Sequence, residues 1–253
     1  MVAYYANLGY GRLGEHSGRY MNVVNHFVPL GYAVYGLDHI GHGKSEGMRE
    51  VVERFDDYTD TLTIYCNMVK GWQTGKPVFL LAHSMGGLIA TYYLLDHQAD
   101  FRGAVISAPA IKVSASISQA AITMGKILSV LAPKAGVLAL DVNGISRDSE
   151  VVKAYVNDPL VFHGKTPARQ AAELVKTMLR VTAGVDKITL PFIVVQGGQD
   201  KLVNPAGAQM LYDKASSKDK TIRVYDGLYH EVFNEPERSR VLKDVETWLA
   251  AHI

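Results

Sequence analysis

The most informative segment of the chain is Pro77-Val-Phe-Leu-Leu-Ala-His-Ser-Met-Gly-Gly87. An apolar, strand-like run ends abruptly at Ser84, and a helix-like pattern follows over residues 88–95. A serine on such a sharp strand-to-helix turn presents its hydroxyl to both a base and a substrate carbonyl, and only small neighbours fit around it. The pattern usually begins with glycine, but this chain has Ala82, which is small enough to keep the turn open. The segment therefore predicts a nucleophile elbow, and with it a serine hydrolase.

The composition is that of an ordinary globular protein with a substantial core, since 48% of its 253 residues are apolar and 20% are charged. The formal net charge of +1 creates no field that would attract nucleic acid or an anionic membrane. The sequence has no run of about 18 apolar residues, so no transmembrane helix is predicted. The first residues lack the pattern of a signal peptide. Cys66 is the only cysteine, which excludes an intrachain disulfide and agrees with a cytoplasmic location.

Apolar strand-like runs alternate with helical patterns along most of the chain, which predicts an α/β fold with a mostly parallel sheet. The expected strands are residues 2–8, 32–37, 78–81, 104–107, 191–196 and 221–225. The expected helices are residues 18–27, 55–72, 205–215 and 236–251. Ligands of such sheets bind at the carboxyl ends of the strands, so the loops that leave those ends are the first place to look for a site.

Residues 111–187 interrupt this alternation, because they show helical patterns and no convincing strand. The apolar residues that share one helical face there are Ile117, Ala120, Ala121, Met124, Ile127, Leu128 and Leu131. By itself this face fits an ordinary core helix, but an insertion after a strand lies over the carboxyl ends of the sheet. We therefore predict a core made of residues 1–110 and 188–253, with residues 111–187 forming a helical cap, or lid.

A serine hydroxyl needs a base, and the base needs an acid that orients it. In α/β hydrolases these residues follow one another in the order serine, acid, histidine. Asp200 lies in a glycine-containing loop just after one predicted strand, and His230 lies just after the next. We predict Ser84, Asp200 and His230 as the catalytic triad. Asp226 and Asp158 are rival acids, and a turn-capping aspartate or a surface histidine is the alternative interpretation of the two partners.

The oxyanion that forms during ester cleavage needs two backbone N–H donors. One should come from Met85, directly after the nucleophile, and the other from the loop around Leu13. The side chain of His83 should point away from the base and serve as a packing or pocket-lining residue. A metal site is not expected, because the histidines do not show a metal-binding spacing.

Several segments together carry a more specific signal. They are Leu13-Gly-Glu-His-Ser-Gly-Arg-Tyr20, Asp38-His-Ile-Gly-His-Gly-Lys-Ser-Glu-Gly47, Ala82-His-Ser-Met-Gly-Gly87, Ser146-Arg147, Asn157-Asp-Pro159, Gly197-Gly-Gln-Asp200 and Tyr229-His230. With them the chain resembles the monoacylglycerol lipase (lysophospholipase-like) family of α/β hydrolases. The resemblance implies the α/β-hydrolase fold, the same triad, Leu13 and Met85 as oxyanion donors, a mobile apolar lid that admits acyl chains, and no cofactor.

The resemblance also places Glu15, Arg19 and His83 near the polar end of the site. We expect Glu15 and Arg19 to brace the oxyanion loop and to shape a pocket for the alcohol; a structural ion pair is the alternative interpretation. Where the family has His-Gly before the position of Leu13, this chain has Gly11-Arg12. The family also has further strands ahead of this loop, so the N-terminal strands are expected to be shortened or missing. The strand at residues 32–37 would then form an exposed edge that favours pairing with a second copy.

These observations predict a serine ester hydrolase that cleaves monoacylglycerols or similar acyl esters through an acyl-serine intermediate. A lysophospholipase or a general carboxylesterase is the alternative with the same chemistry. A catalytically impaired binding protein is the alternative from another class. The expected partners are a lipid or ester substrate and, transiently through the cap, a lipid surface, with no nucleic acid. The expected location is cytoplasmic, or peripheral at membranes.

Overall fold

The structure is a computed structural model that describes residues 2–5, 14–113, 118–139 and 141–253. Its centre is a sheet in which every strand pairing is parallel, in the order β2-β1-β3-β4-β7-β8. The strands are β1 (Val2–Tyr5), β2 (Ala33–Tyr35), β3 (Val78–His83), β4 (Gly103–Ser107), β7 (Phe192–Gly197) and β8 (Lys220–Tyr225). Strands β3, β4 and β7 are buried along their whole length, because both faces of the sheet are covered.

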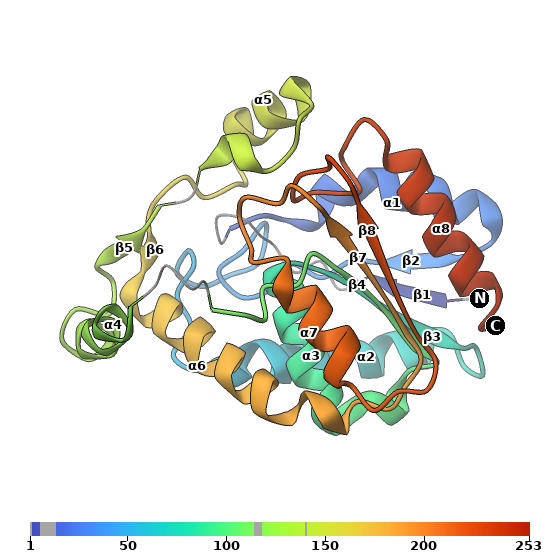
Figure 1. The fold of residues 1–253 in the computed structure, drawn as a ribbon, viewed down its shortest axis with the longest axis horizontal. Helices are drawn as coiled ribbons and strands as arrows, with labels where there is room; N and C mark the ends of the chain where they lie inside the picture. Colours follow the sequence, from blue (N-terminus) through green and yellow to red (C-terminus); the bar gives the residue numbers. More distant parts are fainter. Residues whose placement is uncertain (1, 6–13, 114–117, 140) are drawn as a thin grey trace.

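Helices cover the two faces of this sheet as separate layers (Figure 1). One layer contains α2 (Asp56–Trp72), α3 (Met85–His97) and α7 (Ala206–Lys214), and the other contains α1 (Met21–Phe27) and α8 (Arg238–Ala250). Leu80 of β3 packs with the first layer, whereas Phe79 and Leu81 pack with the second, as the alternation of side chains along a strand requires. The expected parallel α/β sheet is therefore present.

Short turns of 3-10 helix complete the core at η1 (Ser17–Tyr20), η2 (Val28–Leu30), η3 (Gln98–Asp100) and η5 (Val185–Lys187). The strand expected at residues 32–37 is β2, and it is the last strand on its side of the sheet in the part of the chain that the structure describes. The strand nearest the N-terminus, β1, lies inside the sheet between β2 and β3.

The segment at residues 111–187 contains α4 (Gln119–Leu131), η4 (Val142–Gly144), α5 (Ser149–Asn157) and α6 (Ala168–Gly184). The prediction that it holds no strand is wrong, because β5 (Gly136–Leu138) and β6 (Thr166–Pro167) form a small antiparallel ladder. Strands of three and two residues are too short to show an alternating pattern in the sequence. Figure 1 shows α4 and α5 standing away from the main sheet, beyond its carboxyl ends.

Within this segment α4 is apolar but largely exposed: Val130 and Leu131 are 71% and 78% accessible. It packs along α6, whose C-terminal half joins the main core through Val181. Ile117, which was expected on the apolar face of this helix, lies outside the described residues. An exposed apolar helix does not fit an ordinary core element, so the cap interpretation of this segment is favoured and stays a prediction.

Candidate active site

Ser84 lies at the sharp turn between β3 and α3, as the sequence predicts. Its backbone has φ 59° and ψ −114°, a conformation that costs energy for any residue with a side chain. Backbone hydrogen bonds hold the turn in place. The Ser84 N–H donates to the Ser107 carbonyl at 2.8 Å, and the Ser84 carbonyl accepts from the N–H groups of Leu88 and Ala110, both at 3.0 Å. The strain is therefore maintained by contacts with the neighbouring strand and with the first turn of the helix.

Small residues surround the serine for a steric reason. A Cβ added to Gly87 would lie 2.8 Å from both Cα and Cβ of Pro109, so the helix could not approach the loop after β4 as closely. Ala82 is fully buried in β3 and pairs with Ile106 of β4. The alanine that replaces the usual first glycine is therefore accommodated within a regular strand.

The structure brings Ser84, His230 and Asp200 together in a hydrogen-bonded chain. The Ser84 Oγ lies 2.6 Å from Nε2 of His230, and Nδ1 of His230 lies 2.7 Å from Oδ2 of Asp200. The three side chains are buried, and each comes from the loop that follows a parallel strand: β3, β7 or β8. Such a chain can transfer a proton from the serine to the imidazole while the carboxylate holds the ring in place.

Four donors keep the Asp200 side chain ionised. Besides His230, Oδ2 accepts from Nε2 of Gln196 at 2.9 Å, and Oδ1 accepts from the N–H groups of Leu202 and Val203 at 2.8 and 3.1 Å. Burial acts to raise the pKa of Asp200, but His230 and these backbone donors outweigh it and hold the pKa below its ordinary value. Gln196 was not identified from the sequence; its signal was a polar residue in an otherwise apolar strand.

The rival acids lie elsewhere. Asp158 pairs with His16, with 2.8 Å between Oδ2 and Nε2, and so connects the segment after α5 to the loop after β1. Asp226 is exposed at the end of β8. Asp200 is therefore the acid that the geometry favours as the partner of His230.

Of the two predicted oxyanion donors, only Met85 lies within the described residues. Met85 is the first residue of α3, so its N–H has no partner within the helix and carries the positive end of the helix dipole. Leu13 lies outside the described residues. The loop next to it is held by the segment after α5, because the Gly14 carbonyl accepts from the N–H of Phe162 at 3.2 Å.

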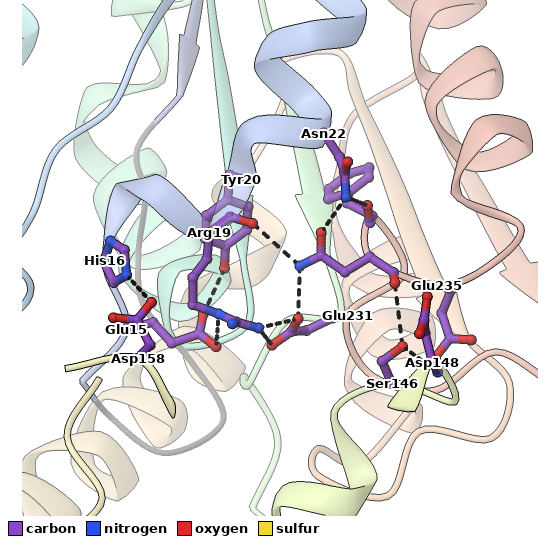
Figure 2. Close-up of polar contacts among 12 residues, drawn as sticks. Glu15, His16, Arg19, Tyr20, Asn22, Ser146, Asp148, Asp158, Glu231 and Glu235 are labelled. Carbon is purple, nitrogen blue, oxygen red and sulfur yellow. Dashed lines mark hydrogen bonds and ion pairs between the residues drawn. The ribbon is translucent and has the colours of Figure 1, made fainter. Parts of the chain in front are cut away.

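Glu15 and Arg19 form part of a buried network of charges (Figure 2). The Arg19 Nε donates to Glu15 at 3.1 Å, and Nη2 donates to the two carboxylate oxygens of Glu231 at 3.1 and 2.8 Å. Burial acts to lower the pKa of Arg19, but the two carboxylates outweigh it and hold the pKa above its ordinary value. Glu231 was not identified from the sequence; its signal was a carboxylate directly after the predicted base.

The prediction that His83 points away from the base is wrong. Its ring packs against that of His230, with 4.6 Å between the ring centroids, and its Nδ1 lies 3.0 Å from the Ser107 Oγ. The reason is the alternation along β3, which turns His83 toward the same layer as Phe79, where the loop that carries His230 also packs. Burial, with His230 and Arg19 nearby, lowers the pKa of His83 well below its ordinary value, so the ring is neutral.

None of the helices in the described residues is long and apolar enough to cross a membrane. The same residues contain no group of three or more histidine, cysteine or acidic side chains that could hold a metal ion.

Known proteins match this chain over most of its length. The family described as serine aminopeptidase, S33 matches residues 9–237. The chain is 38% identical to the monoacylglycerol lipase of Mycolicibacterium smegmatis, over 94% of this chain and 85% of that protein. It is 34% identical to the monoglyceride lipase of Rattus norvegicus, over 95% and 80%. The crystal structure of Paleococcus ferrophilus monoacylglycerol lipase has a TM-score of 0.88 at 29% identity, covering 100% of this chain and 95% of that one.

These matches define the class of protein, and they confirm the α/β-hydrolase fold. The molecule is a serine hydrolase that acts on carboxylic esters. More narrowly, the chain belongs to the monoacylglycerol lipase-like family of α/β hydrolases, which confirms the resemblance found in the sequence.

Proposed function

We propose that this enzyme hydrolyses monoacylglycerols, with Ser84 as nucleophile, His230 as base and Asp200 as the acid that orients the base. The observation that carries the proposal is the buried chain from Ser84 through His230 to Asp200, with contacts of 2.6 and 2.7 Å. The substrate class comes from the similarity to the monoacylglycerol lipases of Mycolicibacterium smegmatis and Paleococcus ferrophilus.

In the first half of the reaction, the Ser84 oxygen attacks the ester carbonyl while Nε2 of His230 takes the serine proton. The tetrahedral intermediate then collapses: His230 gives this proton to the alcohol oxygen, and glycerol leaves an acyl-serine behind. In the second half, His230 takes a proton from water, the resulting hydroxide attacks the acyl carbonyl, and the fatty acid leaves as Ser84 regains a proton from His230. The negative charge of Asp200 stabilises the imidazolium in both halves.

The proposed oxyanion donors are the N–H groups of Met85 and Leu13. The position of Met85 at the start of α3 supports the first of them, and losing one such donor typically costs about 10²- to 10³-fold in rate. Glu15, Arg19 and His83 are proposed to form the polar end of the site, where the alcohol part of the substrate binds. Their burial around the loop of His230 supports this assignment.

Residues 111–187 are proposed to form the cap, with residues 1–110 and 188–253 as the core. The cap lies close to the site, because a small cluster of Ile145, Tyr155 and Val161 contacts Leu202, two residues after Asp200. We further propose that the exposed apolar residues of α4 contact the surface of lipid aggregates. Replacing both Val130 and Leu131 with serine should lower activity on emulsified long-chain esters and leave activity on a dissolved short ester unchanged.

A matched control for that experiment is Ile64→Ser, which removes an apolar side chain that is 64% exposed from α2, a helix of the proposed core. Equal losses in both variants would reject a specific contact of the cap with lipid. Pairing of two copies through β2, the last strand on its side of the sheet among the described residues, is a second proposal, which size-exclusion chromatography tests directly. A cytoplasmic location, with peripheral contact with membranes, also stays a prediction, and cell fractionation tests it.

The decisive experiment measures hydrolysis of monoacyl, diacyl and triacyl glycerols, a lysophospholipid and a p-nitrophenyl ester by wild type and Ser84→Ala. We expect the monoacylglycerol to be cleaved fastest and the variant to be inactive. Faster cleavage of the lysophospholipid, or equal rates on all esters, would favour a lysophospholipase or a general carboxylesterase. Absence of hydrolysis together with no labelling by a fluorophosphonate probe would identify a binding protein instead.

A further inference from the structure

The loop that carries His230 continues directly into a buried carboxylate, Glu231, whose side chain is only 3% exposed. Its Oε1 accepts from Nη2 of Arg19 at 3.1 Å. Its Oε2 accepts from the same Arg19 nitrogen at 2.8 Å and from Nδ2 of Asn234 at 2.8 Å. Both oxygens are therefore used by donors within the loop or on η1, and the Arg19 pair joins two segments that are far apart in the sequence (Figure 2).

A second buried carboxylate, Glu235, holds the other end of the same loop. Its Oε2 accepts from Nε of Arg147 at 2.7 Å, and its Oε1 accepts from the backbone N–H groups of Arg147 and Tyr229 at 2.8 and 3.4 Å. In addition, the backbone N–H of Glu231 donates to the carbonyl of Ile145 at 2.8 Å. The loop is thus fastened to η1 on one side and to the segment at residues 145–147 on the other.

The Arg19 pair has the features of a rigid connection. The guanidinium is planar and rigid, and its Nε donates to Glu15 while its Nη2 donates to Glu231, so it fixes the orientation of the two carboxylates relative to each other. Both side chains are buried, and separating them would leave a charge without its partner in a low-dielectric environment. The same guanidinium binds Glu15, which lies two residues after the proposed oxyanion donor Leu13. One side chain therefore aligns the loop of the base with the loop of the oxyanion donor.

We propose that Glu231 is a positioning residue, which acts through the backbone to hold His230 where Nε2 meets the Ser84 oxygen at 2.6 Å. The inference rests on the proposed function, because it takes His230 as the base. Glu231 itself does not touch the reacting atoms. Its loss should leave substrate binding largely intact and lower the rate of the chemical steps, since a misplacement of about 1 Å can cost on the order of 10²-fold.

The test compares Glu231→Gln, Glu231→Leu, Arg19→Met and the double variant Arg19→Met with Glu231→Leu, using p-nitrophenyl butyrate and counting active sites with a fluorophosphonate. For Glu231→Leu we expect kcat to fall by about 10- to 100-fold with KM changed by less than about twofold. Glu231→Gln should recover part of the rate, because its amide oxygen still accepts from Arg19. The double variant should lose no more kcat than the worse single variant, since both remove the same connection.

The matched control is Glu246→Gln, which breaks an ion pair of 2.9 Å between α8 and His26 of α1 and does not touch the loop of His230. It should keep the wild-type kcat. A lower unfolding temperature in Glu231→Leu with wild-type kcat per active site would overturn the proposal and leave a purely structural ion pair. If Glu231→Leu does not fold, Glu231→Gln takes its place: a lowered kcat per active site would support the proposal, and a wild-type kcat would overturn it. An inactive wild type, or an active Ser84→Ala, would instead refute the proposed function.

Discussion

Replacing Gly197 with alanine tests how closely the loop of His230 is packed against the end of β7. A Cβ added to Gly197 would lie 2.0 Å from the carbonyl oxygen of Tyr229 and 2.6 Å from that of Leu228. Real Cβ atoms essentially never approach another atom closer than 3.0 Å, so the two backbones must separate by about 1 Å. Tyr229 directly precedes His230, so the displacement acts on the base itself.

The size of the effect follows from this geometry. A shift of about 1 Å would lengthen the contacts from His230 to Ser84 and to Asp200, which measure 2.6 and 2.7 Å. A misplacement of that size costs about 10²-fold in rate, and inserting a methyl group into a packed region costs about 1–3 kcal/mol of stability. The assay is kcat on p-nitrophenyl butyrate per titrated active serine, combined with urea unfolding.

Gly198→Ala is the matched control for this prediction. The nearest atoms to a Cβ at Gly198 lie at 3.2 to 3.6 Å, which small adjustments accommodate. This variant should keep kcat within about threefold of wild type, since no backbone has to move by an ångström. Wild-type activity and stability in Gly197→Ala would refute the reasoning, because they would show that the loop can move without losing the alignment of His230.

Three further predictions concern Asp200, the proposed acid of the triad, and the helix α2. Asp200→Asn should lower kcat by about 10⁴-fold with little change in KM, because an amide cannot stabilise the imidazolium; steady-state kinetics with active-site titration measures this. The pKa of Asp200 is lower in the folded state than its ordinary value, so its contribution to stability is fully present above the unfolded pKa of about 3.9 and is lost as the pH falls through the folded pKa. Urea unfolding should therefore show a larger loss of stability below pH 4 for wild type than for Asp200→Asn, and parallel curves would contradict the assignment. Gly71→Ala should stabilise the protein by about 0.5–1 kcal/mol without changing kcat, because a Cβ there meets no atom within 4 Å and alanine favours the helix; thermal unfolding checks it.

The parts of the site that could be predicted from the sequence depend on local patterns. The nucleophile elbow is one continuous segment, in which an apolar strand, a small-residue turn and a helix follow each other. Asp200 and His230 could be placed because each follows a strand, and the strands of a parallel sheet all end on one side. The order of these segments along the chain was therefore enough to predict that the three side chains lie close together.

Other parts could not be predicted, because they depend on which segments meet in space. Glu231 reads as an ordinary acidic residue until Arg19, 212 positions earlier, is placed beside it. Gln196 could be noticed as a polar residue in an apolar strand, but its role depends on the contact with Asp200. His83 was assigned the wrong direction because the elbow alone does not reveal which sheet face the loop of His230 covers.

Position 19 requires arginine rather than lysine because its side chain contacts three separate segments of the chain. It donates to Glu15 after β1 and to Glu231 after β8, and its guanidinium lies 4.7 Å from the centre of the Tyr155 ring on α5. A lysine has one compact ammonium group, which cannot present fixed donors to two carboxylates and a flat face to an aromatic ring at once. The same buried guanidinium therefore contacts α5, in the proposed cap, as well as the loop after β1 and the loop that carries His230.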